Sequence, residues 1–436
     1  MGPRETIPFD TLVLGSGIAG LQAALDLADQ DFRVAILEKD ASIGGKMIRL
    51  SKVFPTLDCS SCITTPKMSA VAHHKNITLF TYCDLKALER TAGGIVASIT
   101  QRPRYVDPNK CIGCRQCEYK CPVYVPDEEQ GGFAARKAIY VPFSNAIPQI
   151  ALVDVDNCIL CGQCEKICPT GAVDYCQDPE DFTLQAKTVI LATGFELTLL
   201  ENKRQYGEGK IPNVITSLQM ERLLAPHGPY ARVLRPSDGM EPGSIAFVQC
   251  AGSRDKSMGI PYCSRVCCMH AIKQGMLLSG ALPLADIFIY YMDIRAFGKG
   301  YEQFFQNAQA MGIQFVKAKV ATLSEGENGS VRVRYEAQDG EGVTTQDHDL
   351  VVLSLGMVPG WDPEGHCHVS QGSDGFIKTI QSKLSPTLTD IEGIYVAGAA
   401  AGPKDIVDSI AEAGAASMEA SKYLHALARG VDKVAA

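Results

Sequence analysis

The sequence has 436 residues, which is enough for two or three domains. Hydrophobic residues make up 46% and charged residues 21%, a composition typical of a folded globular protein and not of a disordered one. The formal net charge of -8 at pH 7 argues against nucleic acid as a partner, because nucleic-acid binding requires a basic face.

The two most apolar stretches, 11–28 and 275–292, are interrupted by charged residues or proline, and neither predicts a direct membrane span. Residues 1–10 lack the basic start and apolar region of a signal peptide, so we expect a cytoplasmic protein. The 17 cysteines then point to metal or redox chemistry, because disulfides are rare in the cytoplasm.

A dinucleotide-binding pattern lies near the start of the chain. Residues 11–14 predict a strand, an Ala- and Leu-rich helix follows, and 34–37 predict a second strand that ends in Glu38 and Lys39. The glycines between the first strand and the helix are Gly15, Gly17 and Gly20. The first permits a tight turn, the second lets the backbone approach a pyrophosphate, and the third lets the helix pack on the sheet. The helix N-terminus suits phosphates, and Glu38 is placed for a ribose hydroxyl.

Two further strands, within 188–196 and 391–397, run into Gly-rich turns, which also suit close approach to a cofactor. The candidate residues of these turns and of the glycine pair after Glu38 are Gly44, Gly45, Ala192, Thr193, Gly194, Gly398, Ala399, Lys404, Asp405 and Ile406. The arrangement resembles flavoproteins of the thioredoxin reductase type, in which the C-terminal turn borders the isoalloxazine ring. That resemblance implies that the cofactor is FAD.

An insert at 102–177 carries the bacterial ferredoxin pattern twice. The first run is Cys111, Cys114, Cys117 and Cys121, and the second is Cys158, Cys161, Cys164 and Cys168, each ending in Cys-Pro. In such runs three cysteines bind one [4Fe–4S] cluster and the fourth reaches the other. The spacing therefore assigns Cys168 to the first cluster and Cys121 to the second. CxxC pairs also bind zinc, but eight cysteines in two such runs favour clusters.

Residues 206–377 are expected to form a second dinucleotide-like domain. Its phosphate turn, in 244–255, lacks GxGxxG and has Cys250 in place of the first glycine, so an NAD(P)H site is not expected. Cys263, Cys267 and Cys268 follow, so that four cysteines lie within nineteen residues. The spacing alone leaves three interpretations open: a third cluster, buried structural cysteines or a redox thiol pair.

Long motifs along nearly the whole chain resemble those of the A-type subunits of heterodisulfide reductase. They include "EKDASIGGKM", "FPTLDCSSCI", "QRPRYVDPNKCIGC", "RKAIYVPF", "YCSRVCC", "MDIRAFGKGYE" and "VAGAAAGPKDI". The resemblance implies that Cys250, Cys263, Cys267 and Cys268 hold a third [4Fe–4S] cluster near the flavin. It also implies a catalytic role for Lys273 close to flavin N5, where a cation would stabilise the reduced, anionic flavin. The alternative for Lys273 is an ordinary helix lysine.

The chain departs from the full-length methanogen protein of this family, because it shows neither the extra N-terminal domain nor the C-terminal ferredoxin domain. Electron entry and exit are therefore expected to use other surfaces or other subunits. The similar flavin subunit of the quinone-interacting complex resembles this chain without the ferredoxin-type ligands, so the cysteines favour the heterodisulfide reductase branch.

Five cysteines remain outside the three sets: Cys59, Cys62, Cys83, Cys176 and Cys367. Cys59 and Cys62 form a CxxC pair that could be a dithiol, a ligand or contact of a cluster shared with a partner, or a structural element. The other three are expected to be small buried hydrophobes.

The predicted fold class is α/β, with two dinucleotide-binding-type domains of the thioredoxin reductase kind and an inserted α+β ferredoxin domain with two [4Fe–4S] clusters. The predicted boundaries are 1–101, 178–205 and 378–436 for the FAD domain, 102–177 for the insert and 206–377 for the degenerate NAD-binding-like domain.

One FAD and three clusters predict a switch between two-electron and one-electron transfer, in a protein whose partners are other redox subunits. The family resemblance adds electron bifurcation, which depends on potentials set by contacts around the cofactors. Two alternatives are a self-contained flavin or dithiol reductase of a small molecule, and an electron-carrying scaffold in which the flavin is only a relay.

Overall fold

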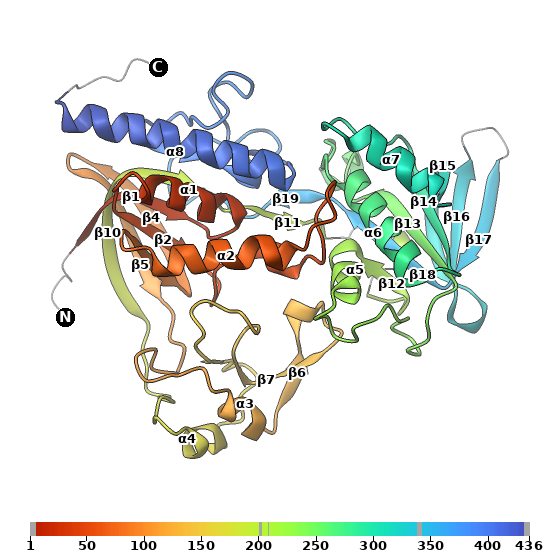
Figure 1. The fold of residues 1–436 in the computed structure, drawn as a ribbon, viewed down its shortest axis with the longest axis horizontal. Coiled ribbons are helices and arrows are strands. Elements are labelled where there is room, and N and C mark those ends of the chain that lie inside the picture. Colours follow the sequence, from red (N-terminus) through yellow and green to blue (C-terminus); the bar gives the residue numbers. More distant parts are fainter. Residues whose placement is uncertain (1–5, 200–202, 208, 338–341, 431–436) are drawn as a thin grey trace. The chain divides into compact units, whose positions relative to one another are not determined.

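The computed structural model describes residues 6–199, 203–207, 209–337 and 342–430 (Figure 1). The chain forms two compact units. Unit 1 contains the residues up to Ile48, Ile63–Phe195 and those from Pro359 on, whereas unit 2 contains Arg49–Cys62 and Glu196–Val358. The short strands β11 (Phe195–Leu197) and β19 (Met357–Pro359), at which the chain changes units, pair with each other.

Unit 1 is built on a seven-stranded sheet with the order β3-β2-β1-β10-β5-β4, in which β20 also pairs with β10. Its strands are β1 (Ile7–Leu14), β2 (Val34–Glu38), β3 (Ile77–Thr81), β4 (Cys83–Thr91), β5 (Gly94–Gln101), β10 (Glu180–Leu191) and β20 (Ile394–Val396). The strands β3, β2, β1, β10 and β20 are parallel, whereas β4 and β5 form an antiparallel hairpin against β10.

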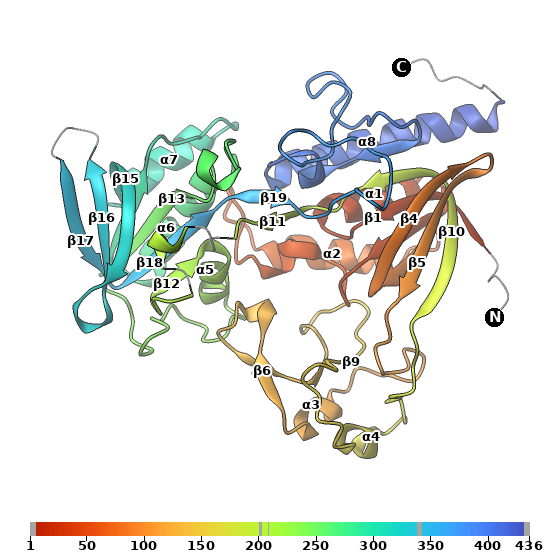
Figure 2. The same cartoon turned by 180° about the vertical axis from the view of Figure 1, so that it is seen from behind.

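The helices of this fold are α1 (Ile18–Ala28), α2 (Ser60–His73) and α8 (Ile406–Ala428). Figures 1 and 2 show α1 beside α8, and Ser417 of α8 donates a hydrogen bond to Asp26 of α1. None of the helices within the described ranges combines the length and the apolar character needed to cross a membrane.

The central strands of unit 1 are almost continuously apolar, as expected for parallel strands that are covered on both faces. Alternate residues of a strand point to opposite faces. Val13 and Ile190 accordingly pack in the core that contains the buried face of α1, while Leu12 and Val189 pack in the core on the other side.

The cysteine-rich insert belongs to unit 1 and has an apolar core of its own. Its elements are α3 (Gln116–Lys120), β6 (Tyr124–Pro126), β7 (Ala135–Lys137), β8 (Ile139–Tyr140), β9 (Leu152–Val153) and α4 (Gln163–Ile167). The buried Arg104 connects it to the sheet region: Nη2 donates to Ala41 O and Thr81 Oγ1, both at 2.8 Å, and the Arg104 carbonyl accepts from Val153 N.

Unit 2 contains a second seven-stranded sheet, with the order β12-β18-β13-β14-β15-β16-β17. Its strands are β12 (Val214–Thr216), β13 (Ser244–Ala251), β14 (Asp286–Tyr291), β15 (Gln314–Glu325), β16 (Val331–Ala337), β17 (Val343–His348) and β18 (Leu350–Leu355). The first five in spatial order, from β12 to β15, are parallel, and β16 and β17 continue from β15 in antiparallel pairs. Its helices are α5 (Ser217–Leu224), α6 (Cys267–Ala281) and α7 (Tyr301–Ala310).

Short 3-10 helices lie at Gly45–Arg49, Glu128–Gln130, Arg204–Tyr206, Lys256–Met258, Glu327–Gly329 and Gly398–Ala401.

The predicted boundaries put Arg49–Cys62 in the FAD domain, whereas the structure includes this segment in unit 2. The reason is a contact distant in sequence, since Ser51 donates from both N and Oγ to Glu221 Oε2 at 2.9 and 2.8 Å.

Glu221 of α5 is a fully buried carboxylate at the centre of unit 2. Its Oε1 accepts from His270 Nε2 at 2.7 Å, Lys273 Nζ at 2.5 Å and Gln274 Nε2. Burial alone would raise the pKa of Glu221, but the charges of Lys273 and His270 outweigh it and hold the pKa well below its ordinary value. One anion therefore joins α5, α6 and the 49–59 loop.

We expect Glu221→Gln to lower the local opening free energy of α5 and α6 by about 3–5 kcal/mol, because it leaves the buried Lys273 charge without its partner. Amide hydrogen exchange measures this energy helix by helix. The exposed Glu302→Gln on α7 is the matched control and should change nothing.

The double variant Glu221→Gln, Lys273→Met removes both charges and should recover most of the lost protection. Equal losses in the single and double variants would contradict this account of the carboxylate.

Candidate cofactor and cluster sites

The carboxyl ends of four parallel strands of unit 1 meet at one edge of the sheet. Gly15 follows β1, Glu38 ends β2, Ala192 follows β10, and Gly398 lies just after β20. From β1 the sheet extends through β2 on one side and β10 on the other, and such a switch point is where open α/β sheets bind ligands. The structure thus brings these sequence-predicted residues together.

Two glycines of the first turn are required by their neighbours. Gly15 has φ +95°, and a Cβ there would lie 2.4 Å from the Ala192 carbonyl oxygen. A Cβ on Gly20 would lie 1.9 Å from the Gly15 oxygen. A Cβ on Gly17 would meet no atom within 4 Å, so the N-cap of α1 faces open space. This is the cradle that a pyrophosphate at a helix N-terminus requires.

The other predicted turns lie against this one. A Cβ on Gly45 would be 2.8 Å from Gly17 Cα, and one on Gly398 would be 2.7 Å from Ala19 Cβ. Gly44, Gly45, Gly194 and Gly398 all have positive φ, between +55° and +119°. Thr193 follows Ala192 in the turn after β10, and Ala399 lies in the 3-10 helix that begins at Gly398.

The polar residues predicted for this site already have partners in the protein. Glu38 accepts from Ser16 N at 2.8 Å, Ser16 Oγ at 2.5 Å and Asp40 N at 2.9 Å, and burial raises its pKa. Glu38 therefore fixes the glycine turn through Ser16, while its oxygens retain lone pairs for a ribose hydroxyl.

Three further predicted residues serve the backbone or a helix start. The carbonyl of Lys39 accepts from Arg102, and Lys404 pairs with Glu412 of α8. Asp405 caps α8, which begins at Ile406, by accepting from Asp408 N at 2.8 Å.

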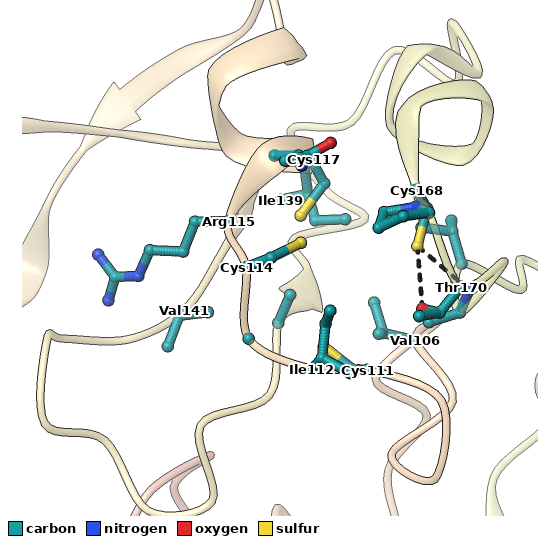
Figure 3. Close-up of a pocket in the computed structure, with 16 residues that line it drawn as sticks. Val106, Cys111, Ile112, Cys114, Arg115, Cys117, Ile139, Val141, Cys168 and Thr170 are labelled. Carbon is teal, nitrogen blue, oxygen red and sulfur yellow. Dashed lines mark hydrogen bonds between the residues drawn. The ribbon is translucent and has the colours of Figure 1, made fainter.

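A pocket in the insert brings together four cysteines from both runs (Figure 3). They are Cys111, Cys114, Cys117 and Cys168. The walls are largely apolar and include Val106, Ile139, Val141, Ala172 and Val173. Thiolates in an apolar surrounding are the donor set of a [4Fe–4S] cluster, so the residues fit that group.

The two runs adopt matching backbone conformations. Gly113 and Leu160 occupy the same place in their runs and have φ of +64° and +52°, and Arg115 and Gly162 match at +59° and +67°. A Cβ on Gly113 would lie 2.7 Å from the Gln149 carbonyl oxygen, so only glycine fits there. Leu160 occurs at the matching place, where it is exposed and its N–H donates to Cys158 Sγ.

Three cysteines of the second run, Cys158, Cys161 and Cys164, lie near Tyr175. Cys164 Sγ lies 2.8 Å from the Tyr175 hydroxyl. Burial raises the pKa of Tyr175, and Cys164, Cys158 and Cys161 add to the rise, so these thiols lie near the ring. Cys121 is buried in the same apolar core as Cys164. No three His, Cys, Asp or Glu side chains converge on one ion point within the described ranges, and the cysteines of a cubane each bind a separate iron.

The third cysteine set lies at the carboxyl edge of the unit 2 sheet. Cys250 has φ +58° and lies in a bulge of β13 against β18, and bulges re-aim side chains. Cys267 Sγ is 3.5 Å from Leu355 O at the end of β18, and Cys268 Sγ is 3.8 Å from Asp293 O after β14. Burial raises the pKa of Cys268 to about 11, with Cys250 and Cys263 adding to the rise. The four thiols are therefore neighbours.

Two buried polar groups on the two strands that border this set, β13 and β18, have no partner within the described part of the chain. They are the side-chain amide of Gln249, both N and O, and the hydroxyl of Ser354. Burying such groups without hydrogen bonds is costly, and each orphan calls for an explanation. Gln249 precedes Cys250 on β13, and Ser354 lies on the adjacent β18. The orphaned donors fit a group with hydrogen-bond acceptors, such as the sulfides of a cluster.

Lys273 lies in α6, with its side chain buried and its ammonium on Glu221. Its place near flavin N5 stays a prediction.

Sequence reasoning missed Glu221, Gln249 and Arg104. Glu221 gave no signal, because its segment reads as an ordinary amphipathic helix after the Thr216–Gln219 capping box.

Gly15→Ala should abolish flavin binding, because the new Cβ would clash with the Ala192 carbonyl at a φ that alanine disfavours. Flavin absorbance per chain measures the effect, with iron content reporting that the insert is intact. Gly280→Ala at an exposed, open helical position is the control. Full flavin content in Gly15→Ala would contradict the assignment.

Iron analysis of a double variant tests the cross-ligation of the insert. Cys114→Ser with Cys168→Ser should lose about four irons in total if both residues hold the same cubane, and about eight if they hold different ones. Cys176 is exposed, so the prediction that it is a small buried hydrophobe is wrong; Cys176→Ser, outside all three sets, should lose none. A loss of eight irons would show that each run builds its own cluster.

Two domain families match the chain. Residues 110–173 match the 4Fe-4S dicluster domain, and residues 13–59 match the NAD(P)-binding Rossmann-like domain. Among solved structures, thioredoxin reductase of T. acidophilum superposes with a TM-score of 0.54 at 16% identity, covering 97% of this chain and 99% of that one. The predicted fold class is confirmed.

Curated relatives of this chain are named as A subunits of heterodisulfide reductases. The A-type subunit of the "H(2):CoB-CoM heterodisulfide,ferredoxin reductase" of Methanothermobacter marburgensis is 43% identical over 426 residues, or 96% of this chain and 64% of that protein. An A-type iron-sulfur subunit of the "CoB--CoM heterodisulfide reductase" of Methanopyrus kandleri is 45% identical over 432 residues, or 97% and 66%. The chain thus spans less than two thirds of these relatives' length. The resemblance to the A-type heterodisulfide reductase subunits that the sequence motifs indicated is thus confirmed over almost the whole of this chain.

Proposed function

We propose that the chain is the FAD- and [4Fe–4S]-containing electron-transfer subunit of a heterodisulfide reductase-like oxidoreductase complex. One observation carries the proposal. Cysteines of both ferredoxin runs line a single pocket in an insert of the same unit that carries the glycine cradle. A two-electron cofactor site and one-electron cluster sites in one unit are what a switch between the two kinds of transfer needs.

Bound FAD would exchange electrons in pairs or singly, and each cluster would carry one electron. The chain's own part is to bind and position these groups. The glycine turn after β1 and the N-terminus of α1 bind the pyrophosphate, and Glu38 holds Ser16 of that turn in place. The insert cysteines bind the clusters between apolar walls, and Arg104 fixes the insert to the sheet region.

We assign a third cluster to Cys250, Cys263, Cys267 and Cys268. Support comes from their shared place at a sheet edge and from the orphaned amide of Gln249, which precedes Cys250 on β13. In this proposal the ferredoxin insert serves one external one-electron partner and the third cluster a second. A relative whose name includes both a heterodisulfide and a ferredoxin supports two electron routes, and hence bifurcation, for this chain.

We further propose that the donor and acceptor are other protein subunits and that NAD(P)H does not bind. The turn after β13 carries Cys250 in place of the first glycine, and cysteines occupy the edge at which a Rossmann-like sheet would hold a nicotinamide dinucleotide. For Lys273 we propose a positioning role toward the flavin, with its ammonium charge maintained by Glu221.

Anaerobic iron, acid-labile sulfide and flavin analysis, with EPR of the reduced protein, tests the proposal. About twelve irons and one FAD per chain are expected, and Cys250→Ser should lose about four of those irons. NADH should not bleach the flavin. About eight irons would mean that the third set holds no cluster and consists of structural cysteines. A chain without flavin, or with zinc in place of iron, would refute the proposed function.

A further inference from the structure

The CxxC pair outside the three cysteine sets lies at the start of a helix. Cys59 occupies the N-cap position of α2, which begins at Ser60. The backbone N–H of Cys62 donates to Cys59 Sγ at 3.2 Å, which brings the two residues into contact. Both are free, with Cys59 half-buried and Cys62 exposed. The pair is therefore accessible and already in mutual contact.

The loop before the helix holds Cys59 in place. Cys59 forms a backbone bridge with Lys52, and Ser60 N donates to Ser51 O at 3.2 Å. Ser51 is in turn fixed by its two hydrogen bonds to Glu221. The nucleophile candidate thus lies on a backbone anchored to the core of unit 2, and functional groups on rigid supports act most reliably.

The surroundings of Cys59 favour its thiolate. The hydrogen bond from the Cys62 thiol is the largest influence and lowers the pKa of Cys59, with further help from the N–H groups of Cys62 and Ser61 and the charge of Lys52. Burial opposes this only in part. The same thiol contact raises the pKa of Cys62. A thiolate at a helix start paired with a second thiol in a CxxC motif is typical of disulfide oxidoreductases.

The geometry also permits the pair to close. Residues three apart on a helix have Cβ atoms about 5–6 Å apart, whereas a disulfide needs Cβ atoms about 3.5–4.5 Å apart. Closing the bond therefore requires a backbone adjustment at Cys59, which lies at the N-cap position, where the backbone is not yet helical. None of the other described cysteines outside the cluster sets, namely Cys83, Cys176 and Cys367, has a thiol neighbour of this kind.

We propose that Cys59 and Cys62 form a redox-active dithiol that reduces accessible disulfides. The Cys59 thiolate attacks one sulfur of the disulfide, which forms a mixed disulfide and releases one thiolate. The Cys62 thiolate then attacks Cys59 Sγ, which closes the Cys59–Cys62 bond and releases the second thiolate. Two electrons pass to the substrate, and an external dithiol restores the pair by the reverse exchange. This activity is additional to the proposed function and requires neither flavin nor cluster.

Redox titration of the full cofactor-loaded chain with reduced and oxidised glutathione tests the proposal. After acid trapping, mass spectrometry should show an internal disulfide between Cys59 and Cys62 that dithiothreitol reverses. Cys62→Ser should instead accumulate a glutathione mixed disulfide on Cys59. Cys59→Ser keeps a good N-cap residue, so the helix should remain intact while the internal disulfide disappears. Cys176→Ser should behave as the wild type.

The rate of iodoacetamide alkylation gives a second readout. In the reduced chain, alkylation of Cys59 should reach its half-maximal rate at a lower pH than alkylation of Cys62, whose pKa the same contact raises. Replacing Lys52 by Met should move that midpoint upward, since it removes the neighbouring cation.

Two outcomes would overturn the proposal. If both thiols resist alkylation and each Ser variant loses about four irons, the pair ligates a cluster. If both alkylate but no internal disulfide forms at any glutathione ratio, they are ordinary surface cysteines. Either result leaves the flavin and iron contents of the wild type unchanged, so it is distinguishable from a failure of the proposed function.

Discussion

The architecture of unit 2 depends on one buried carboxylate. Glu221 accepts hydrogen bonds from three residues of α6 and from the loop that carries the CxxC pair, and it is the positive charge of Lys273 that keeps the carboxylate ionised in the core. Removing one member of such a group lowers the free energy of unfolding by more than the intact group adds to it. The reason is that the remaining partner is left charged in a medium of low dielectric. The same anion fixes the helix that begins with Cys267 and Cys268.

Unit 1 reaches its rigidity by a different route, namely close backbone contact. The turns after β1, β10 and β20 touch one another through glycines whose Cβ positions are occupied by other backbone or side-chain atoms. Gly17 and Gly194 in these turns border open space instead. These turns pack against each other on one side and border open space on the other. They therefore leave room for a cofactor while their own backbone is held in place.

Local patterns in the sequence were sufficient for much of this fold. The glycine motif and the ferredoxin runs each specify their geometry within about thirty residues, so strand, turn and helix followed from spacing alone. Contacts between distant segments could not be read in this way. Nothing near Arg49–Cys62 indicates that the segment joins unit 2, because its partner Glu221 lies 170 positions away from Ser51. The orphaned amide of Gln249 likewise becomes visible only when β18 lies beside β13.

The shared pocket of the insert has a consequence for biosynthesis. Cys168 lies with Cys111, Cys114 and Cys117, although fifty or more residues of chain separate it from them. A nascent chain that has emerged only as far as the first run presents three thiols and an open corner. Iron loaded at that stage would be exposed to solvent and oxidant. Assembly of the proposed cluster at this site would therefore wait for the second run, and the insert would be a single unit of assembly whose timing is set by translation and not by the order of its motifs.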